Sequence, residues 1–308
     1  MKVEIHPLSP LPLPEASVYD SYDFCHLNAP RADKVINLCG TDSKSKVKIA
    51  LTAGKRDGKW MAPFSAPFSS IRVKNGVNTA ALTEFFNEVS HVLDAPLKLT
   101  LPPSLYNPDL QQATWYAALS AGAQQMPLWL NHHFPLERMA DYRTALSPSA
   151  RNKLNAALRV MYDFTPCAAL EDAYAIIEAN RAAHGYPLRM TLEQLRQTAA
   201  VVHIDSAVLS LDDTPVAAAI VYHVTPGIVQ VIYWGDTAAP EAPHPMNRLA
   251  YELFTHYYNC GLKIVDIGPS TSPEEPNPGL ATFKESIGCV ATLKPTLVLN
   301  ASDNITHA

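Results

Sequence analysis

The sequence predicts an α/β fold of the α+β kind, built as two similar domains in tandem. The run from Tyr233 to Gly288 reads strand, loop, amphipathic helix, short buried strand, polar loop and helix, which is the order of a mixed sheet flanked by helices. The first half repeats this order, since helix starts near 80 and 245 lie 165 residues apart and strand starts near 97 and 263 lie 166 apart. We therefore expect domains at 1–145 and 146–308, each with a mixed, mostly antiparallel sheet.

The elements of the first half follow from periodicity and turn residues. Residues 47–52 read as a strand, and a turn bounded by glycines at 54–58 leads to a second extended stretch through Trp60. Next comes a helix of about 14 residues, because apolar residues recur at helical spacing on one face: Leu82, Phe85, Phe86, Val89 and Leu93. The remaining predicted elements are a half-buried strand at 97–101, a helix at 108–122 and a strand at 128–130.

The second half begins with residues 135–164, which we expect to be helical throughout, with Ser147 as an N-cap before Pro148. A later helix is opened by Thr191 with a capping-box partner at Gln194. The predicted elements after residue 165 are helices at 170–184, 191–202, 245–260 and 279–287, and strands at 207–211, 216–223, 228–234, 263–267 and 292–299.

Composition is that of an ordinary globular protein. The chain has 308 residues, of which 47% are hydrophobic and 17% charged, enough for two domains with sizeable cores. Four prolines interrupt the first 20 residues, and no apolar run reaches the roughly 18 residues of a membrane span, so we expect a cytoplasmic protein without such a span. Five cysteines are scattered without CxxC spacing, which argues against a disulfide framework and against a zinc site.

Charge and motif content exclude several classes of function. Residues 1–150 carry 14 Lys and Arg against 13 Asp and Glu, whereas residues 151–308 carry 10 against 16. Because nucleic-acid-binding proteins usually show a basic face, DNA is excluded as a main partner and tRNA is disfavoured. The chain has no GxSxG, Walker A or Rossmann glycine pattern, so serine hydrolases, P-loop NTPases and classical dehydrogenases are excluded as well.

The order helix, helix, three-strand meander, helix, strand, helix, strand over residues 165–300 resembles the GNAT family of N-acetyltransferases. Five segments narrow the resemblance to its FemABX branch, which has two tandem GNAT-like domains and would cover nearly the whole chain. The segments are Ser149-Ala150-Arg151-Asn152-Lys153-Leu154, Tyr233-Trp234-Gly235-Asp236, Met246-Asn247-Arg248-Leu249, Asp266-Ile267-Gly268-Pro269-Ser270, and Gly279-Leu280 through Phe283-Lys284-Glu285-Ser286-Ile287-Gly288.

This resemblance implies a transferase that forms an amide on an amine acceptor, either a small molecule or a peptidoglycan-precursor-like compound. It implies acyl-CoA or acetyl-CoA as the donor, with aminoacyl-tRNA as the alternative, and no metal. No coiled-coil arm is visible, and residues 236–247, at the place of the family's CoA phosphate loop, contain no glycine. A catalytically inactive GNAT-fold protein that binds a ligand or regulates a partner is therefore the second hypothesis.

Three residues are the candidate catalytic groups. The resemblance implies that Lys284, in the Phe-Lys pair of the last segment, pairs with a phosphate or carboxylate or steadies the tetrahedral intermediate. Asp266 interrupts an apolar strand, so it is either catalytic or held by a structural hydrogen bond. The resemblance also implies that Tyr233 borders the donor together with Trp234, and the alternative is that both hold their strand in the core.

The candidate substrate-binding residues are Trp234, Asn247, Ser270 and Arg151. Ser270 either binds a polar substrate or caps a turn. Arg151 either binds an anionic substrate or is a solvated helix residue. The neighbouring pair His132-His133 has no cysteine or acid at ligand spacing, so we expect no metal there.

Overall fold

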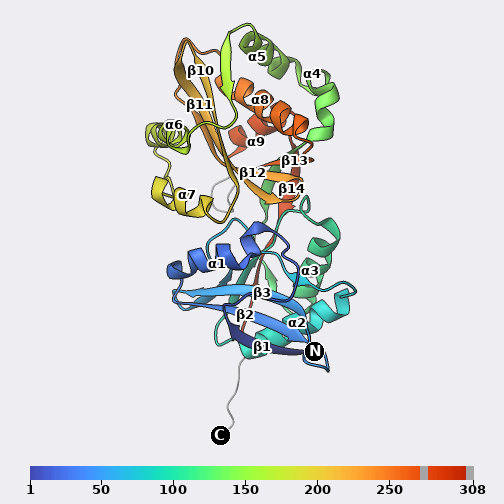
Figure 1. Ribbon diagram of the computed structural model, residues 1–308. Coiled ribbons are helices and arrows are strands. Elements are labelled where there is room, and N and C mark those ends of the chain that lie inside the picture. The colour runs from blue at the N-terminus through green and yellow to red at the C-terminus, as the bar shows by residue number, and fades with distance from the viewer. Residues whose placement is uncertain (271–276, 303–308) are drawn as a thin grey trace. The chain divides into compact units, whose positions relative to one another are not determined.

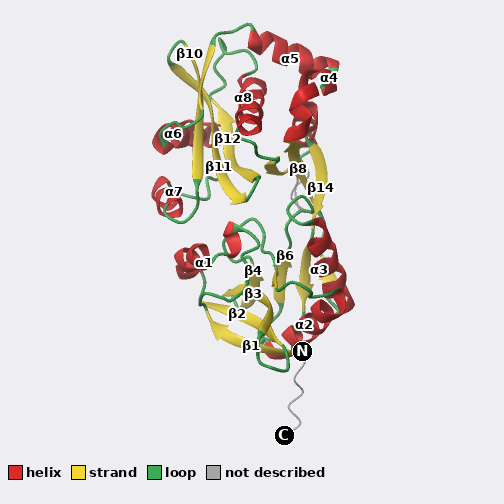
Figure 2. Ribbon diagram, turned by 45° about the vertical axis from the view of Figure 1, so that its right-hand side comes forward, coloured by secondary structure: helices red, strands yellow, loops and turns green. Residues whose placement is uncertain are grey.

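The computed structural model describes residues 1–270 and 277–302 (Figure 1). Its contacts divide the chain into two compact units. The first unit is Met1–Trp129 together with Thr292–Ala308, and the second is Leu130–Ala291. In each unit the helices flank a single large sheet (Figure 2). None of the helices within the described residues is both long enough and apolar enough to cross a bilayer.

The sheet of the first unit is antiparallel except where β4 runs parallel to β6. In spatial order its strands are β1 (Lys2–Pro7), β2 (Lys34–Thr41), β3 (Val47–Arg56), β4 (Lys59–Ala62), β6 (Leu97–Thr100), β15 (Thr296–Leu299) and β7 (Gln124–Gln125), and β5 (Arg72–Val73) pairs with β3 outside this row. Its helices are α1 (Tyr22–Asn28), α2 (Thr79–Val92) and α3 (Pro108–Ser120).

The sheet of the second unit is also mixed. In spatial order its strands are β14 (Val290–Lys294), β8 (Trp129–Pro135), β13 (Ile264–Pro269), β12 (Ile228–Asp236), β11 (Thr214–Thr225), β10 (Ile204–Leu211) and β9 (Tyr162–Thr165). Its helices are α4 (Tyr142–Ala145), α5 (Pro148–Leu158), α6 (Leu170–Ala183), α7 (Leu192–Ala199), α8 (Pro245–Asn259) and α9 (Pro278–Ser286). Only β12 and β13 pair in parallel among the registers described.

The predicted repeat is confirmed at the level of topology. Each sheet has four strands joined in antiparallel order, then a strand parallel to the fourth, reached through α2 in one unit and α8 in the other. In both sheets the sixth place is taken by a strand from outside this series, β15 in the first unit and β8 in the second. The fold class, two mixed and mostly antiparallel sheets flanked by helices, is therefore as expected. The units differ from the ranges 1–145 and 146–308 because β8 joins the second sheet and β15 the first.

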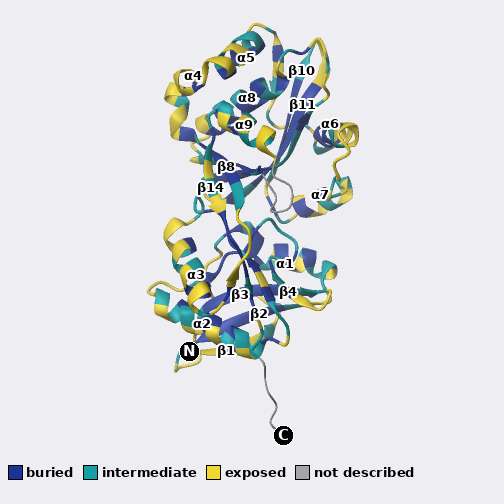
Figure 3. Ribbon diagram, turned by 180° about the vertical axis from the view of Figure 1, so that it is seen from behind, coloured by how far each residue is buried: buried dark blue, intermediate teal, exposed yellow. Residues whose placement is uncertain are grey.

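Apolar stripes explain how the helices cover the sheets. In α2 the Asn78 side chain caps the first turn by accepting from the Ala81 N–H, and the buried face carries Leu82, Phe85, Phe86 and Val89. In α8 the buried face carries Leu249, Ala250, Leu253, Phe254 and Tyr257. Figure 3 shows the central strands of each unit as largely buried, with exposed residues concentrated on the outer faces of the helices.

Two predictions of local structure were wrong. Residues 135–164 are not helical throughout, because a 3₁₀ segment at Leu136–Asp141, α4 and α5 end before β9 adds an edge strand to the sheet. Residues 292–299 do not form one strand. Pro295 separates β14 from β15, and the two strands belong to different sheets.

Candidate functional site

The parallel strands β12 and β13 part from one another after a short shared stretch. They pair at only three positions, from Ile228 opposite Ile264 to Gln230 opposite Asp266. Beyond these positions β12 continues to Asp236, still paired with β11 on its other edge. The β11 register shifts at this point so that Ile232 is an extra residue, a β-bulge. Within the described residues, one edge of β12 beyond Gln230 thus has backbone groups with no partner strand.

Asp266 lies at the last paired position and is fully buried. Its Oδ1 accepts from Asn131 Nδ2 at 2.8 Å and from the Gly268 N–H at 2.9 Å, and its Oδ2 accepts from Gln230 Nε2 at 2.7 Å. These donors come from β8, β12 and β13 itself, so one carboxylate links three adjacent strands. Such a carboxylate is satisfied where it lies, which corresponds to the structural alternative for Asp266.

Lys284 on α9 is also buried, with 2% of its surface exposed. Its Nζ donates to the carbonyl oxygens of Ile267 and Gly268 at 2.8 Å and of Pro269 at 2.9 Å. Burial lowers the pKa of Lys284 to about 8, although the nearby Asp266 carboxylate acts in the opposite direction. All three ammonium protons are directed at the end of β13, so these contacts give Lys284 the geometry of a positioning residue.

His132 and Ser270 form a second buried pair at the same end of β13. The Ser270 hydroxyl lies 2.6 Å from His132 Nδ1, and the Ser270 N–H donates to the Leu130 carbonyl at 2.8 Å. His132 Nε2 lies 3.6 Å from the carboxylate of Glu285 on α9. Burial lowers the pKa of His132, as does the Lys284 charge, so the imidazole is neutral at pH 7.

Tyr233 and Trp234 project from opposite faces of β12, as neighbours on a strand must. The Trp234 ring meets Phe283 of α9 edge to face at 6.0 Å and packs against the core of the second unit. Arg181 lies 5.9 Å from the Tyr233 ring. Burial raises the pKa of Tyr233, so its hydroxyl stays protonated. Trp234 therefore contacts α9, the helix that carries Lys284, whereas Tyr233 lies on the other side of the sheet.

The last two predicted binding residues lie on other helices. Asn247 is buried in the first turn of α8, where its N–H donates to the His244 carbonyl at 3.1 Å. Arg151 donates from Nη2 to the Leu146 carbonyl at 3.0 Å, just before its own helix α5. The described side-chain hydrogen bond of Arg151 is thus made to the residues just before its own helix, and its role in substrate binding stays a prediction.

Sequence reasoning missed the partners supplied by β8 and β12. Asn131, His132 and Gln230 lie buried with Asp266, Ser270 and Lys284 around the end of β13, and we call these six residues the buried polar group. Nothing in the local sequence of the first three links them to Asp266 or Ser270. The only signal was the His132-His133 pair at a predicted strand end. The strand runs to Pro135 rather than ending at 130, which carries these polar residues into the sheet.

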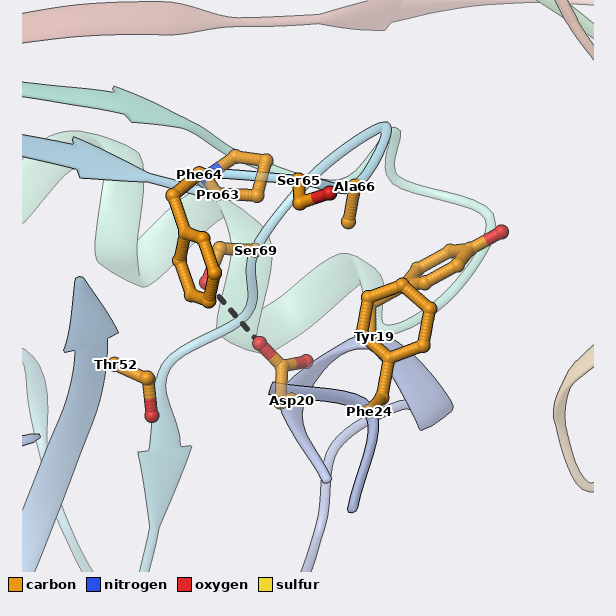
Figure 4. Close-up of a pocket in the computed structure, with 9 residues that line it drawn as sticks. All are labelled: Tyr19, Asp20, Phe24, Thr52, Pro63, Phe64, Ser65, Ala66 and Ser69. Carbon is orange, nitrogen blue, oxygen red and sulfur yellow. Dashed lines mark hydrogen bonds between the residues drawn. The ribbon is translucent and has the colours of Figure 1, made fainter. Parts of the chain in front are cut away.

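The first unit contains a small pocket around a buried carboxylate (Figure 4). Asp20 accepts from the Ser17 hydroxyl at 2.6 Å, the Ser69 hydroxyl at 3.1 Å and the Ser70 N–H at 2.9 Å. Burial raises the pKa of Asp20 to about 6, against these three hydrogen bonds. Since the carboxylate ties together two loops of the unit, its contacts are those of a structural group. The lining residues are Tyr19, Asp20, Phe24, Thr52, Pro63, Phe64, Ser65, Ala66 and Ser69.

No protein-family model matches the chain, and no curated protein matches it in sequence. Solved structures match nearly its whole length. FemX has a TM-score of 0.62 at 8% identity, covering 89% of this chain and 90% of that one. A C-terminal domain assigned to a lysylphosphatidylglycerol synthetase from Agrobacterium fabrum has a TM-score of 0.61 at 13% identity, covering 92% and 88%. A tandem GNAT protein from the clavulanic acid biosynthesis pathway has a TM-score of 0.50 at 13% identity, covering 97% and 99%. The chain has the tandem GNAT-like fold of these FemX-like structures.

Proposed function

We propose that the chain is a transferase that moves an acyl or aminoacyl group onto the amine of an acceptor, at the parting of β12 and β13 in the second unit. The observation that supports this most strongly is the edge of β12 beyond Gln230, which pairs with none of the described strands and carries a bulge at Ile232. In GNAT-like enzymes, backbone N–H groups at this place are expected to face the acyl carbonyl. Donors fixed in a sheet stabilise a developing oxyanion without reorganisation, which is the largest single contribution in many acyl transfers.

The buried polar group gives this edge a fixed shape. Asp266 ties β8, β12 and β13 together at the last paired position, and Lys284 holds the backbone just beyond it. In this proposal both act as positioning residues, while Trp234 borders the donor. The amine must lose a proton before it attacks. Neutral His132, reached through the Ser270 hydroxyl at 2.6 Å, is the proton acceptor that the arrangement favours.

Acyl-CoA, including acetyl-CoA, is the proposed donor, and aminoacyl-tRNA is the alternative. The second unit, Leu130–Ala291, carries 11 Lys and Arg against 17 Asp and Glu, a net charge of −6. Such a balance disfavours a long polyanion such as tRNA. The glycine-free loop before α8 still bends through left-handed residues, with φ of 53° at Ala238 and 52° at His244. The acceptor is proposed as a small-molecule amine or a peptidoglycan-precursor-like amine.

A binding or regulatory protein without catalysis is the second candidate. It is favoured by one observation, namely that Lys284 and Asp266 are occupied by partners within the protein and would have to exchange them to touch a substrate. The same contacts are compatible with catalysis only if the reacting groups are the β12 backbone and the His132–Ser270 pair.

Thermal-shift and calorimetric titrations with acetyl-CoA, longer acyl-CoAs and free CoA test the donor. A ligand at 100 times its dissociation constant stabilises the folded state by about 2.7 kcal/mol. Transfer is then measured with labelled donor and an amine panel, comparing Ser270→Ala with Thr214→Ala, since Thr214 is the exposed first residue of β11. We expect saturable acyl-CoA binding, and transfer that falls in Ser270→Ala alone. Binding without transfer to any amine supports the second candidate, and failure of both acyl-CoA and aminoacyl-tRNA to bind refutes the transferase.

A further inference from the structure

Two histidines and an aspartate lie on one face of the second sheet, at the ends of β10 and β11. The His223 N–H donates to the His203 carbonyl at 3.0 Å, and the next residues, Ile204 and Tyr222, lie opposite each other in the β10–β11 pairing. His203 and His223 are therefore direct cross-strand neighbours. Asp205 is two residues from His203 and points to the same side. A paired sheet thus holds all three side chains together.

Their donor atoms converge on a common point. His203 Nε2 lies 3.2 Å from Asp205 Oδ1, and His223 Nε2 lies 2.7 Å from Asp205 Oδ2. One ligand atom from each residue lies within 4.8 Å of the other two. The two imidazole rings stack at 4.0 Å and are tilted by only 8°. Both Nε2 atoms face Asp205, because each lies close to one of its carboxylate oxygens. An ion with metal–ligand distances of about 2.0–2.2 Å fits between three atoms at this spacing after small side-chain rotations.

The carboxylate is oriented from behind by a buried tyrosine. The Tyr257 hydroxyl, from α8, donates to Asp205 Oδ2 at 3.0 Å. A hydrogen bond of this kind fixes the orientation of a carboxylate that is to act as a metal ligand.

We propose that His203, Asp205 and His223 bind a divalent transition metal of the Zn²⁺ class. Two imidazoles and one carboxylate suit Zn²⁺, Co²⁺ or Ni²⁺, whereas Mg²⁺ and Ca²⁺ prefer sites made of oxygen alone. His203 is exposed on its outer side. Water therefore reaches the remaining coordination positions. Tyr257 acts as the positioning residue of the carboxylate.

This site is separate from the proposed transfer site. His223 pairs with Val229, near the start of β12. The proposed transfer site lies along the other edge of β12, the one that faces β13, whereas His223 is on β11 and Asp205 is on β10. The inference therefore does not depend on the proposed transferase. A metal here would fasten the ends of β10 and β11 and, through Tyr257, the end of α8.

The test is a calorimetric titration of the untagged full chain, stripped with chelator, using Zn²⁺, Co²⁺ and Mg²⁺ alone. We expect saturable one-to-one binding of Zn²⁺ and Co²⁺, visible d–d absorption of bound Co²⁺, and no binding of Mg²⁺ at the same concentrations. Tyr257→Phe should weaken Zn²⁺ binding by about 10- to 100-fold. His203→Gln and Asp205→Asn should weaken it more, because each removes a ligand.

His184→Gln is the matched control, because His184 is an exposed histidine of the same unit that lies against Tyr186. It should bind Zn²⁺ as the parent protein does. The side chain of His203 is 69% exposed, so His203→Gln should keep its fold, which circular dichroism checks. Absence of saturable Zn²⁺ binding overturns the proposal, as does binding that His203→Gln and Asp205→Asn leave at the strength of His184→Gln.

Discussion

Replacing Lys284 by Met removes the ammonium group and keeps most of the side-chain volume. In the parent protein this group donates to three carbonyl oxygens at the end of β13. Each buried carbonyl that loses its donor costs about 1–3 kcal/mol, or roughly 3–9 kcal/mol for three. Holding the cation in the interior has a cost as well. The pKa of Lys284 falls from 10.5 to about 8, and a difference of that size corresponds to about 3 kcal/mol.

The variant loses the hydrogen bonds and is relieved of the ionisation cost, so we expect it to be destabilised by about 3 kcal/mol at pH 7. The sign of the pH dependence follows from the lowered pKa. Between about pH 8 and pH 10.5 the unfolded chain keeps a proton that the folded protein has released, so the stability of the parent rises with pH in this window. Lys284→Met has no such rise, and the difference between the two proteins should grow to about 6 kcal/mol at pH 10.5.

The assay is urea denaturation at several pH values from 7 to 10.5, followed by far-ultraviolet circular dichroism. Lys263→Met is the control, because Lys263 is an exposed lysine directly before β13. It should behave as the parent at every pH. A Lys284→Met protein whose midpoint equals that of the parent at pH 7, or whose deficit does not change between pH 8 and 10.5, would refute the reasoning about the buried ammonium.

Three further substitutions test other parts of the structure. The pKa of Asp20 is raised to about 6 in the folded protein, so the parent should lose about 3 kcal/mol of stability as pH rises from about 4 to 6. Asp20→Asn should abolish this loss. Denaturation curves with the same pH dependence in both proteins would contradict this. Thr191→Ala removes the hydroxyl that accepts from the Gln194 N–H in the capping box and should cost about 1 kcal/mol, measured as a urea midpoint against Thr214→Ala. Phe254→Ala should cost about 3–5 kcal/mol, since its ring stacks on Phe134 at 4.1 Å, and a cost below 1 kcal/mol would argue against β8 as part of this core.

Helices were predictable because each signal is local. The stripe of Leu82, Phe85 and Val89 fixes α2, and the pair Thr191 and Gln194 marks the start of α7, with both capping hydrogen bonds present. The strands β8 and β15, which join a sheet out of chain order, were not predictable in the same way. Whether β15 completes the first sheet or extends β14 depends on long-range pairing, which leaves no trace in the periodicity of eight residues.

The sequence named single residues of the candidate site but not their assembly, and their functional roles stay predictions. Asp266, Ser270 and Lys284 were marked by their place at a strand end and by a family-like motif. Asn131 and Gln230, the partners of Asp266, lie 135 and 36 residues from it in sequence, so no spacing rule joins them. The histidine cluster was missed because its pattern, His-x-Asp on one strand and a single His on the next, is visible only once the hairpin register is known.

The parting of β12 and β13 is built by polar side chains rather than by a lack of contacts. Two strands that separate in a sheet expose backbone groups, and a buried backbone group without a partner is unfavourable. Asp266 accepts a hydrogen bond from the Gly268 N–H just beyond the shared pairing, and Lys284 donates to the carbonyl oxygens of Ile267, Gly268 and Pro269. The end of β13 is thus satisfied by its own side chains and by α9, while no described strand pairs with the β12 edge beyond Gln230, where we propose that the ligand binds. Burying an acid and a lysine is unfavourable unless both are hydrogen-bonded, so Asp266 and Lys284 are better explained as groups that shape this separation than as by-products of lost strand pairing.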